Sequence, residues 1–143
     1  MPMRLEILTA EGVLFDGDVD SVVAPGSEGE LGILPRHAAL MTMLQPGELR
    51  YRTAGGESYL AVHGGFMEVS GDHVVVLADA AEHVDAIDAA RAEEAVRRAQ
   101  ERIASRSADM DIERALRSLR RAQVRVRITR RRRPRAQPLT NSG

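Results

Sequence analysis

The sequence predicts an α+β protein, mostly β, in which an antiparallel β-sandwich of about ten strands precedes an antiparallel two-helix hairpin and a disordered tail. Two observations predict this fold. Up to about residue 84, short apolar stretches alternate with turn-forming residues roughly every 8–12 positions, as in sandwiches and flattened barrels. From residue 85 the apolar spacing becomes that of helices. We therefore divide the chain into residues 1–84, 85–128 and 129–143.

The expected strands are runs of β-branched or alternating apolar residues. They are RLEILT (4–9), VDSVVA (19–24), ELRYRT (48–53), SYLAV (58–62), FMEVS (66–70) and HVVVLA (73–78). The segments between them supply the Gly and Asp residues that tight turns use. They are DGD (16–18), PGSEGE (25–30), QPGE (45–48), AGGE (54–57), HGG (63–65) and SGD (70–72), and we expect a turn at each of them.

Two apolar stripes at helical spacing predict the hairpin. The first stripe is Ala89, Ala92, Val96, Ala99 and Ile103, and the second is Ile112, Leu116, Leu119, Gln123 and Val126. Asp85 or Asp88 would be the N-cap of the first helix. The segment 104–111 interrupts the pattern, so the helices fold back on each other. From residue 129 the Arg-rich, polar chain predicts a disordered tail.

Composition separates the two parts of the chain. Residues 1–90 hold 15 acidic residues and 4 Arg, a balance of −11, whereas residues 91–143 hold 6 acidic residues and 16 Arg, a balance of +10. Such opposite charges indicate different partners for the two parts. Cysteine is absent, which excludes a disulfide framework, a thiolate metal site and a Cys nucleophile.

The sequence contains no recognisable catalytic motif. It lacks a Gly-rich phosphate loop, a nucleophile elbow and an HExxH pair. The alternating Asp residues of DGDVD (16–20) do not continue into a calcium loop, and the four His lack the close spacing of metal ligands. We therefore expect no catalytic residue and no metal site. The run Arg130–Arg133 has no interleaved aromatic residues, so no nucleic-acid partner is expected, although the run leaves such a protein as a further alternative.

Arginines of the hairpin carry the stronger functional signal. Arg91 and Arg98 lie on one face of the first helix, and Arg121 and Arg125 lie on one face of the second. After its first turn the second helix bears many Arg residues and no further acid. A helix surface of this kind favours an external anion, either a phosphate or an acidic protein segment.

Several motifs in a fixed order give the chain a family resemblance. They are GSEGELGILPRHAAL (26–40), GGFMEV (64–69), VLADAAE (76–82) and IDAARA (87–92). Together they resemble the epsilon subunit of bacterial F-type ATP synthases over about residues 3–128. The resemblance implies the same sandwich and hairpin, and a non-catalytic, peripheral place on the cytoplasmic face of the cell membrane without insertion into it.

The resemblance also implies partners and site residues. The chain would belong to the central stalk of a proton-translocating synthase and would contact the gamma subunit and the c-ring through the loop that carries Glu30 and His37. Arg114, Arg117 and Arg120 would meet acidic loops of the catalytic beta subunits. No cofactor is required, but ATP is implied as a regulatory ligand. Its implied site is Glu82, Ile87, Asp88, Arg91, Ala92, Arg98, Arg121 and Arg125.

Two hypotheses follow for the hairpin. In the first, ATP binds the folded hairpin and favours it, whereas scarce ATP lets the second helix extend and block ATP hydrolysis. In the second, the chain is an assembly adapter that does not sense nucleotide. Asp88 and Arg91 would then only start a helix, a role whose loss costs about 1 kcal/mol.

Overall fold

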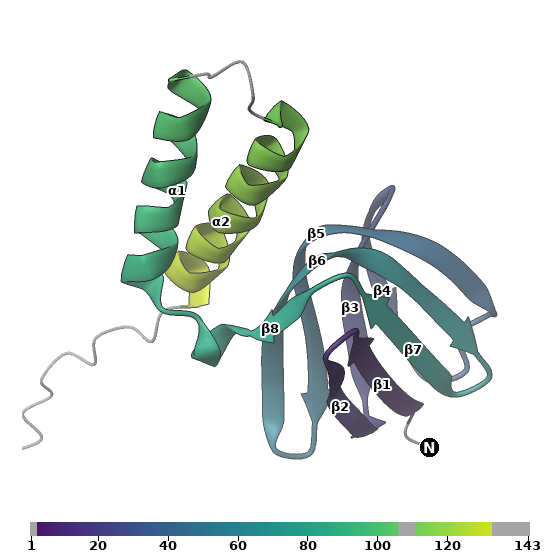
Figure 1. Ribbon diagram of the computed structural model, residues 1–143. Helices are drawn as coiled ribbons and strands as arrows, with labels where there is room; N and C mark the ends of the chain where they lie inside the picture. Colours follow the sequence, from purple (N-terminus) through teal and green to yellow (C-terminus); the bar gives the residue numbers. More distant parts are fainter. Residues whose placement is uncertain (1–2, 106–110, 133–143) are drawn as a thin grey trace, which may run out of the picture.

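A β-sandwich with a helical hairpin beside one end of it makes up the computed structural model, which describes residues 3–105 and 111–132 (Figure 1). The elements are β1 (Met3–Thr9), β2 (Gly12–Val19), β3 (Ser21–Gly26), β4 (Gly29–Ile33), β5 (Leu40–Thr53), β6 (Gly56–Ser70), β7 (His73–Ala78), β8 (Ala81–His83), the short 3₁₀ turn η1 (Val84–Ala86), α1 (Ala89–Ala104) and α2 (Ile112–Arg132). The predicted fold class is thus confirmed.

The strands pair in the order β2-β1-β7-β6-β5-β3-β4, and β8 pairs with β6. All neighbouring strands are antiparallel except β1 and β7, which run parallel. The expectation of a wholly antiparallel sandwich is therefore wrong at this pair. A pattern of alternating residues reports which face is buried but not the direction of the neighbouring strand.

The described residues form eight strands instead of about ten, because two strands are long and continuous. β5 runs straight through QPG (45–47), and β6 runs through HGG (63–65). DGD (16–18) lies inside β2, a strand that the sequence did not predict. The expected turns at these three places are wrong, because glycine within a strand also allows bends and close approaches of the backbone. The expected turns in PGSEGE (25–30), AGGE (54–57) and SGD (70–72) are confirmed.

Gly65 shows why glycine is needed within β6. Its φ of +119° lies in the left-handed region, and a Cβ atom added there would sit 2.1 Å from the backbone oxygen of Leu77 on β7. Gly64 before it also has a positive φ. The two glycines bend β6 while keeping it paired, and they bring His63 and Asp79 close to the end of the sandwich.

Inward-facing side chains of β1, β6 and β7 form the centre of the sandwich core. Ile7 pairs with Val76, and Val76 pairs with Met67, so three fully buried side chains stand in one row across the sheet. Phe15 on β2 and Tyr51 on β5 stack with their ring centroids 4.3 Å apart. Because β2 and β5 are not neighbours in the sheet, this aromatic pair joins its two layers.

The hairpin buries two different sides of α2. Ala92 and Ala99 of α1 are buried as the first stripe predicts. The second stripe is partly wrong, because Ile112 is 46% exposed and Gln123 is also exposed. The residues that α2 buries are Ala115, Ala122, Val124 and Ile128. A single apolar stripe could not describe the buried residues of α2, because the helix contacts both α1 and the sandwich.

Val124 and Ile128 dock the hairpin on the sandwich. They form a second apolar cluster with Ala61 of β6 and Val84 of η1, against which Tyr59 and Ile87 pack. Ile128 is only 2% exposed. α2 extends to Arg132, so the predicted start of the disordered tail at residue 129 is wrong by four residues, and residues 133–143 lie outside the described part.

Arg132, in the last described turn of α2, stabilises the same interface through an ion pair with the sandwich. Its Nε and Nη2 atoms donate to the two carboxylate oxygens of Glu48 at 2.9 and 2.6 Å. Its guanidinium also lies 4.1 Å from the ring centroid of Tyr59. The side chain of Glu48 is 7% exposed. A bidentate and largely buried ion pair of this kind is much stronger than an ion pair on the surface.

We predict that Gly65→Ala destabilises the sandwich by about 2–6 kcal/mol, because it adds backbone strain and overpacking of about 1–3 kcal/mol each. The midpoint of denaturant unfolding would measure the effect. Gly32→Ala is the control, since an added Cβ there has no neighbour within 4 Å. Equal midpoints for the two variants would contradict the role of Gly65.

We predict that acid weakens hairpin docking before it unfolds the sandwich. Burial raises the pKa of Glu48, but the hydrogen bonds and charge of Arg132 more than offset it, so the pKa is below its ordinary value. The contribution is therefore complete above the ordinary Glu pKa of about 4.3 and is lost as pH falls through the lower folded pKa. Hydrogen exchange of α2 amides between pH 7 and pH 3 would follow this loss.

Glu48→Gln should weaken docking by about 1–3 kcal/mol at pH 7, because it removes a hydrogen bond between charged groups. It should also remove most of the acid dependence in α2. Glu94→Gln is the matched control, since Glu94 pairs with Arg98 only on the surface, at 3.7 Å. Identical exchange in both variants would show that Arg132 and Glu48 do not hold the hairpin.

Candidate functional site

The residues implied as a nucleotide site line two adjoining grooves on one side of the hairpin. The larger groove, of about 620 Å³, is lined by seven of them, namely Glu82, Ile87, Asp88, Arg91, Ala92, Arg98 and Arg125. The eighth, Arg121, lines a second groove of about 270 Å³ that shares Arg98 and Arg125 with the first. The fold thus places all eight residues along two adjoining grooves, from β8, from α1 and the two residues before it, and from α2.

Asp88 has a structural role at the mouth of the larger groove. It is the N-cap of α1, and its side chain accepts a hydrogen bond from the backbone nitrogen of Arg91 at 3.1 Å. Asp85, the other predicted cap, lies in η1. This bond satisfies one of the free N–H groups at the start of α1. An assembly adapter that does not sense nucleotide would need the same cap.

Glu82 connects the sandwich to α2 at the base of the groove. Its carboxylate forms an ion pair with the Nε atom of Arg125, and its Oε1 atom lies 3.6 Å from Nε2 of the buried His63. The nearby His63 ring and the Arg125 guanidinium lower the pKa of Glu82, while burial opposes them. Glu82 therefore stays ionised and keeps Arg125 in place.

The remaining arginines of the grooves are available to an anion. Arg98 is 63% exposed and pairs with Glu94 only at 3.7 Å. Within the described residues, Arg91 and Arg121 form no ion pair. Arginines of the two helices therefore line two adjoining grooves, and their mutual repulsion would be relieved by a polyanion bound across both.

Two implied residues have only apolar roles here. Ala92 is 4% exposed at the base of the groove. Ile87 is half-buried and packs against the second apolar cluster, between the hairpin and the sandwich. The side chain of Ile87 therefore helps to dock the hairpin on the sandwich, a contact that sequence spacing could not predict.

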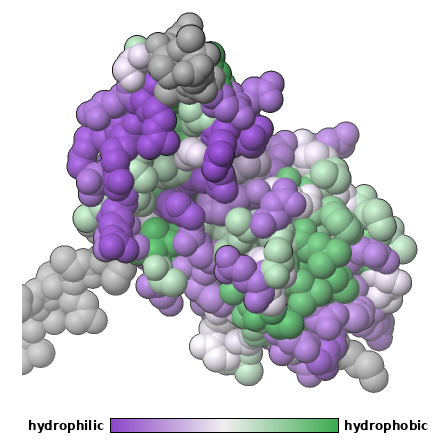
Figure 2. All heavy atoms as spheres, viewed as in Figure 1, coloured by the Kyte–Doolittle hydropathy of each residue, from purple (hydrophilic) through white to green (hydrophobic). Residues whose placement is uncertain are grey.

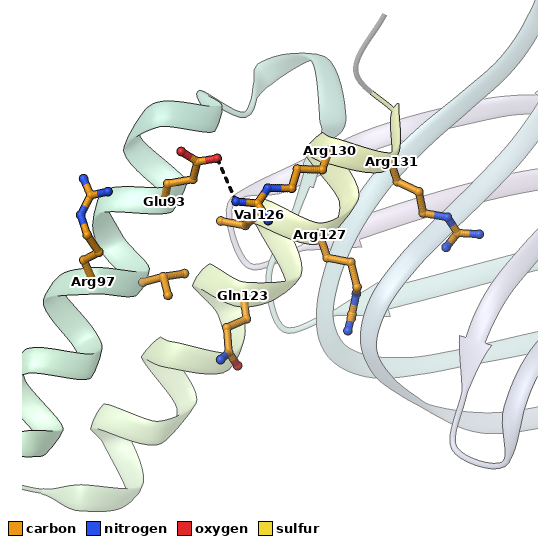
Figure 3. A pocket seen from close by; sticks show the side chains of 8 residues that line it. Glu93, Arg97, Gln123, Val126, Arg127, Arg130 and Arg131 are labelled. Carbon is orange, nitrogen blue, oxygen red and sulfur yellow. Dashed lines mark hydrogen bonds and ion pairs between the residues drawn. The ribbon is translucent and has the colours of Figure 1, made fainter. Parts of the chain in front are cut away.

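A third groove, of about 940 Å³, lies on the opposite side of the hairpin (Figure 3). The sequence did not predict this groove. It is lined by Glu93, Val96, Arg97, Gln123, Val126, Arg127, Arg130 and Arg131. Arg130 reaches across to Glu93 at 3.4 Å, whereas Arg131 points away from it. This third Arg-lined groove provides matched controls for any anion that binds the hairpin.

The three arginines implied in contact with beta subunits project into solvent. Arg114, Arg117 and Arg120 are exposed in the first half of α2, and none forms an ion pair within the described residues. The backbone nitrogen of Arg114 donates to Asp111 at 3.0 Å. Their charges are therefore open to an acidic partner.

The expectation that one loop carries both Glu30 and His37 is wrong for Glu30, which lies within β4 and pairs with Pro25 of β3, whereas His37 lies in the segment between β4 and β5. Glu30 pairs with Arg50 at 3.3 Å and lines a cavity of about 550 Å³ together with Met41 and Met43. His37 follows Arg36, whose φ of 67° is positive and whose backbone nitrogen donates to Asp72 at 2.8 Å. No hydrogen bond or ion pair joins Glu30 to His37 in the described part of the chain.

An exposed apolar ladder crosses the outer face of the sandwich, and sequence reasoning missed it. Paired residues of five neighbouring strands, β5, β6, β7, β1 and β2, form it in the order Met43, Phe66, Leu77, Leu8 and Val13. Met43 and Val13 are each 63% exposed. Apolar side chains also gather on the visible face of the sandwich, in contrast to the polar hairpin (Figure 2). Rows of this kind mark protein interfaces.

Among the described residues, no cluster of His, Asp and Glu is arranged to hold a metal ion. Searching the same residues for a helix both long and apolar enough to cross a membrane finds none.

Comparison with known proteins identifies the family. Residues 2–84 match the model of the ATP synthase delta/epsilon chain β-sandwich domain, and residues 85–130 match that of its long α-helix domain. Chains named ATP synthase epsilon chain are similar throughout. One from Herpetosiphon aurantiacus is 49% identical, covering 94% of this chain and 99% of its own, and one from Desulforamulus reducens is 48% identical, covering 87% and 94%.

Solved structures share the fold at low sequence identity. A chain of the Euglena gracilis mitochondrial ATP synthase, in a structure of OSCP, F1 and the c-ring, superposes with a TM-score of 0.73 at 22% identity. The match covers 86% of this chain and 78% of that one. The family models span both halves of the described structure. The chain therefore belongs to the ATP synthase delta/epsilon chain family, and its bacterial relatives are epsilon chains.

Proposed function

We propose that this epsilon-family chain is a non-catalytic subunit of the central stalk that couples rotation of the c-ring and gamma subunit to catalysis and inhibits ATP hydrolysis through its hairpin. It would work on the cytoplasmic face of the cell membrane, at a proton-translocating synthase. The observation that carries the proposal is the division of the surface: an apolar ladder on the sandwich and Arg-lined grooves on the hairpin.

The apolar ladder is the surface that we assign to the gamma subunit. Five paired strands hold its side chains on one rigid sheet, so that docking requires little ordering of the surface. Glu30 of β4 shares a cavity with Met41 and Met43 near one end of the ladder, and we assign Glu30 and His37 to contact with the c-ring and gamma. The exposed Arg114, Arg117 and Arg120 would meet acidic beta-subunit loops.

Nucleotide would act on the docked hairpin. A triphosphate bound in the grooves would neutralise Arg91 and Arg98 of α1 together with Arg121 and Arg125 of α2. The two grooves adjoin only while the helices lie side by side, so ATP would bind the docked state better than an extended one. A ligand shifts a conformational equilibrium by the difference between its affinities for the two states. Low ATP would then free α2 to block hydrolysis.

The second candidate function is a stalk adapter that does not sense nucleotide. The N-cap bond of Asp88 to the backbone of Arg91 favours it, because helix capping is a sufficient reason for this Asp. Capping uses the side chain of Asp88 and the backbone of Arg91, so it explains neither the guanidinium of Arg91 nor that of Arg121. Substituting these two arginines therefore distinguishes the two hypotheses.

We predict that the full chain binds ATP in calorimetric titration and that Arg91→Ala and Arg121→Ala each weaken binding about tenfold or more, because each removes a charged hydrogen bond. Arg127→Ala is the matched control, since Arg127 lines the groove on the opposite side of the hairpin. Failure of the unsubstituted chain to bind millimolar ATP would favour the adapter. Equal losses in all three variants would indicate non-specific attraction to the Arg-rich surface.

We predict that Phe66→Asp weakens binding to purified gamma subunit by about 2 kcal/mol or more, because it places a charge in the middle of the ladder. Phe66 is 36% exposed, so the sandwich should keep its fold. Ser70→Asp adds the same charge on β6 outside the ladder and should bind normally. Normal gamma binding by Phe66→Asp would mean that the ladder is not the interface.

A further inference from the structure

A continuous row of ion pairs joins the end of α2 to β4, the strand at one end of the sheet order. Arg132 pairs with Glu48 of β5 at 2.6 Å, and Arg50 lies 3.6 Å from the same carboxylate. Arg50 in turn pairs with Glu30 of β4 at 3.3 Å. Residues two positions apart in a strand face the same side of the sheet, so Glu48 and Arg50 are neighbours. The four residues form one ion-pair network.

The members of the network differ in their access to solvent. The side chain of Glu48 is 7% exposed, and that of Arg50 is 27% exposed. Glu30, at the far end of the network from α2, is 58% exposed. Charges that are partly buried are screened by salt and water less than charges on the surface. An event at the exposed Glu30 can therefore act on the buried Glu48 through Arg50.

Arg50 and Arg132 approach one and the same oxygen atom of Glu48. Nη1 of Arg50 and Nη2 of Arg132 both face Oε1, but only Arg132 lies within hydrogen-bond distance of it. Arg50 donates its hydrogen bond to Glu30 instead, from Nη2 to Oε1. Glu30 therefore draws Arg50 away from Glu48, which leaves that carboxylate to Arg132.

We propose that this network couples the binding of a partner at Glu30 to the docking of the hairpin. A basic side chain of a partner that pairs with Glu30 deprives Arg50 of its hydrogen-bond acceptor. Arg50 then turns to Oε1 of Glu48, competes with Arg132 and weakens the docking of α2. Coupling between two sites is reciprocal, so release of α2 leaves Glu48 to Arg50 and frees Glu30 for the partner.

The inference rests on the proposed function for the identity of the partner, since Glu30 is assigned there to contact with the c-ring and gamma. It adds regulation to that contact, because engagement of the stalk at Glu30 and release of the hairpin favour each other. ATP in the grooves would favour the docked hairpin. Nucleotide and stalk contact would therefore act on the hairpin in opposite directions.

The first test uses the full chain without a partner and measures hydrogen exchange of α2 amides at pH 7. We expect Glu30→Gln to speed exchange in the last two turns of α2 about three- to tenfold, because Arg50 loses its charged partner. Glu28→Gln is the matched control: it removes the same charge two positions away, and Glu28 forms no ion pair among the described residues. Equal exchange in the two variants would overturn the coupling.

A double-mutant cycle tests whether Arg50 transmits the effect. Arg50→Gln alone should not speed α2 exchange, because it removes the competitor of Arg132. Adding Glu30→Gln to Arg50→Gln should then change exchange by less than about twofold. If the full effect of Glu30→Gln persisted without Arg50, general electrostatics would explain it and the network would not.

The second test adds purified c-ring with gamma subunit. Binding should speed α2 exchange in the unsubstituted chain and in Glu28→Gln, and Arg50→Gln should abolish this acceleration. A bound chain without acceleration, or equal acceleration in Arg50→Gln, would refute the link between stalk contact and docking. Absence of binding to the c-ring and gamma would overturn the proposed function, whereas the response of the free chain to Glu30→Gln would still establish the coupling.

Discussion

The docking of α2 on the sandwich is the contact on which the rest of the hairpin depends. Val124 and Ile128 bury an apolar face against β6 and η1, and Arg132 closes the interface on a largely buried Glu48. If α2 left this position, Arg125 would separate from Glu82, and the grooves would lose one wall. One interface therefore supports both the folded hairpin and the proposed nucleotide site.

The docked state holds two opposing electrostatic effects. Pairs such as Arg132 with Glu48 and Arg125 with Glu82 favour it, because sandwich carboxylates neutralise helix cations. The unpaired arginines that face one another across the two helices oppose it. A polyanion bound in the grooves would relieve this repulsion and would strengthen docking without altering the pair of Arg132 and Glu48. Because ATP would act on one effect and pH on the other, the two can be varied separately.

Local periodicity was enough to predict the two helices and a cap at Asp85 or Asp88, whereas the eight residues that line the grooves came from the family resemblance. It failed where partners are distant in the chain. Glu48 and Arg132 are 84 positions apart, and no feature of the local sequence marks either residue as part of the contact that docks the hairpin. The HGG segment has the composition of a turn, yet the close backbone of β7 makes it a bend in one long strand. The ladder was missed for the same reason, since five strands each contribute one side chain.

The residues of IDAARA differ in how much they say about function. Asp88 caps α1 and Ile87 packs in the docking cluster, so both have sufficient structural reasons to be where they are. Arg91 has none among the described contacts: its backbone is capped, but its guanidinium is exposed and forms no ion pair. Arg121, on the other helix, is in the same position. The motif's functional content therefore rests on its arginine and on the distant Arg121, which lines the adjoining groove.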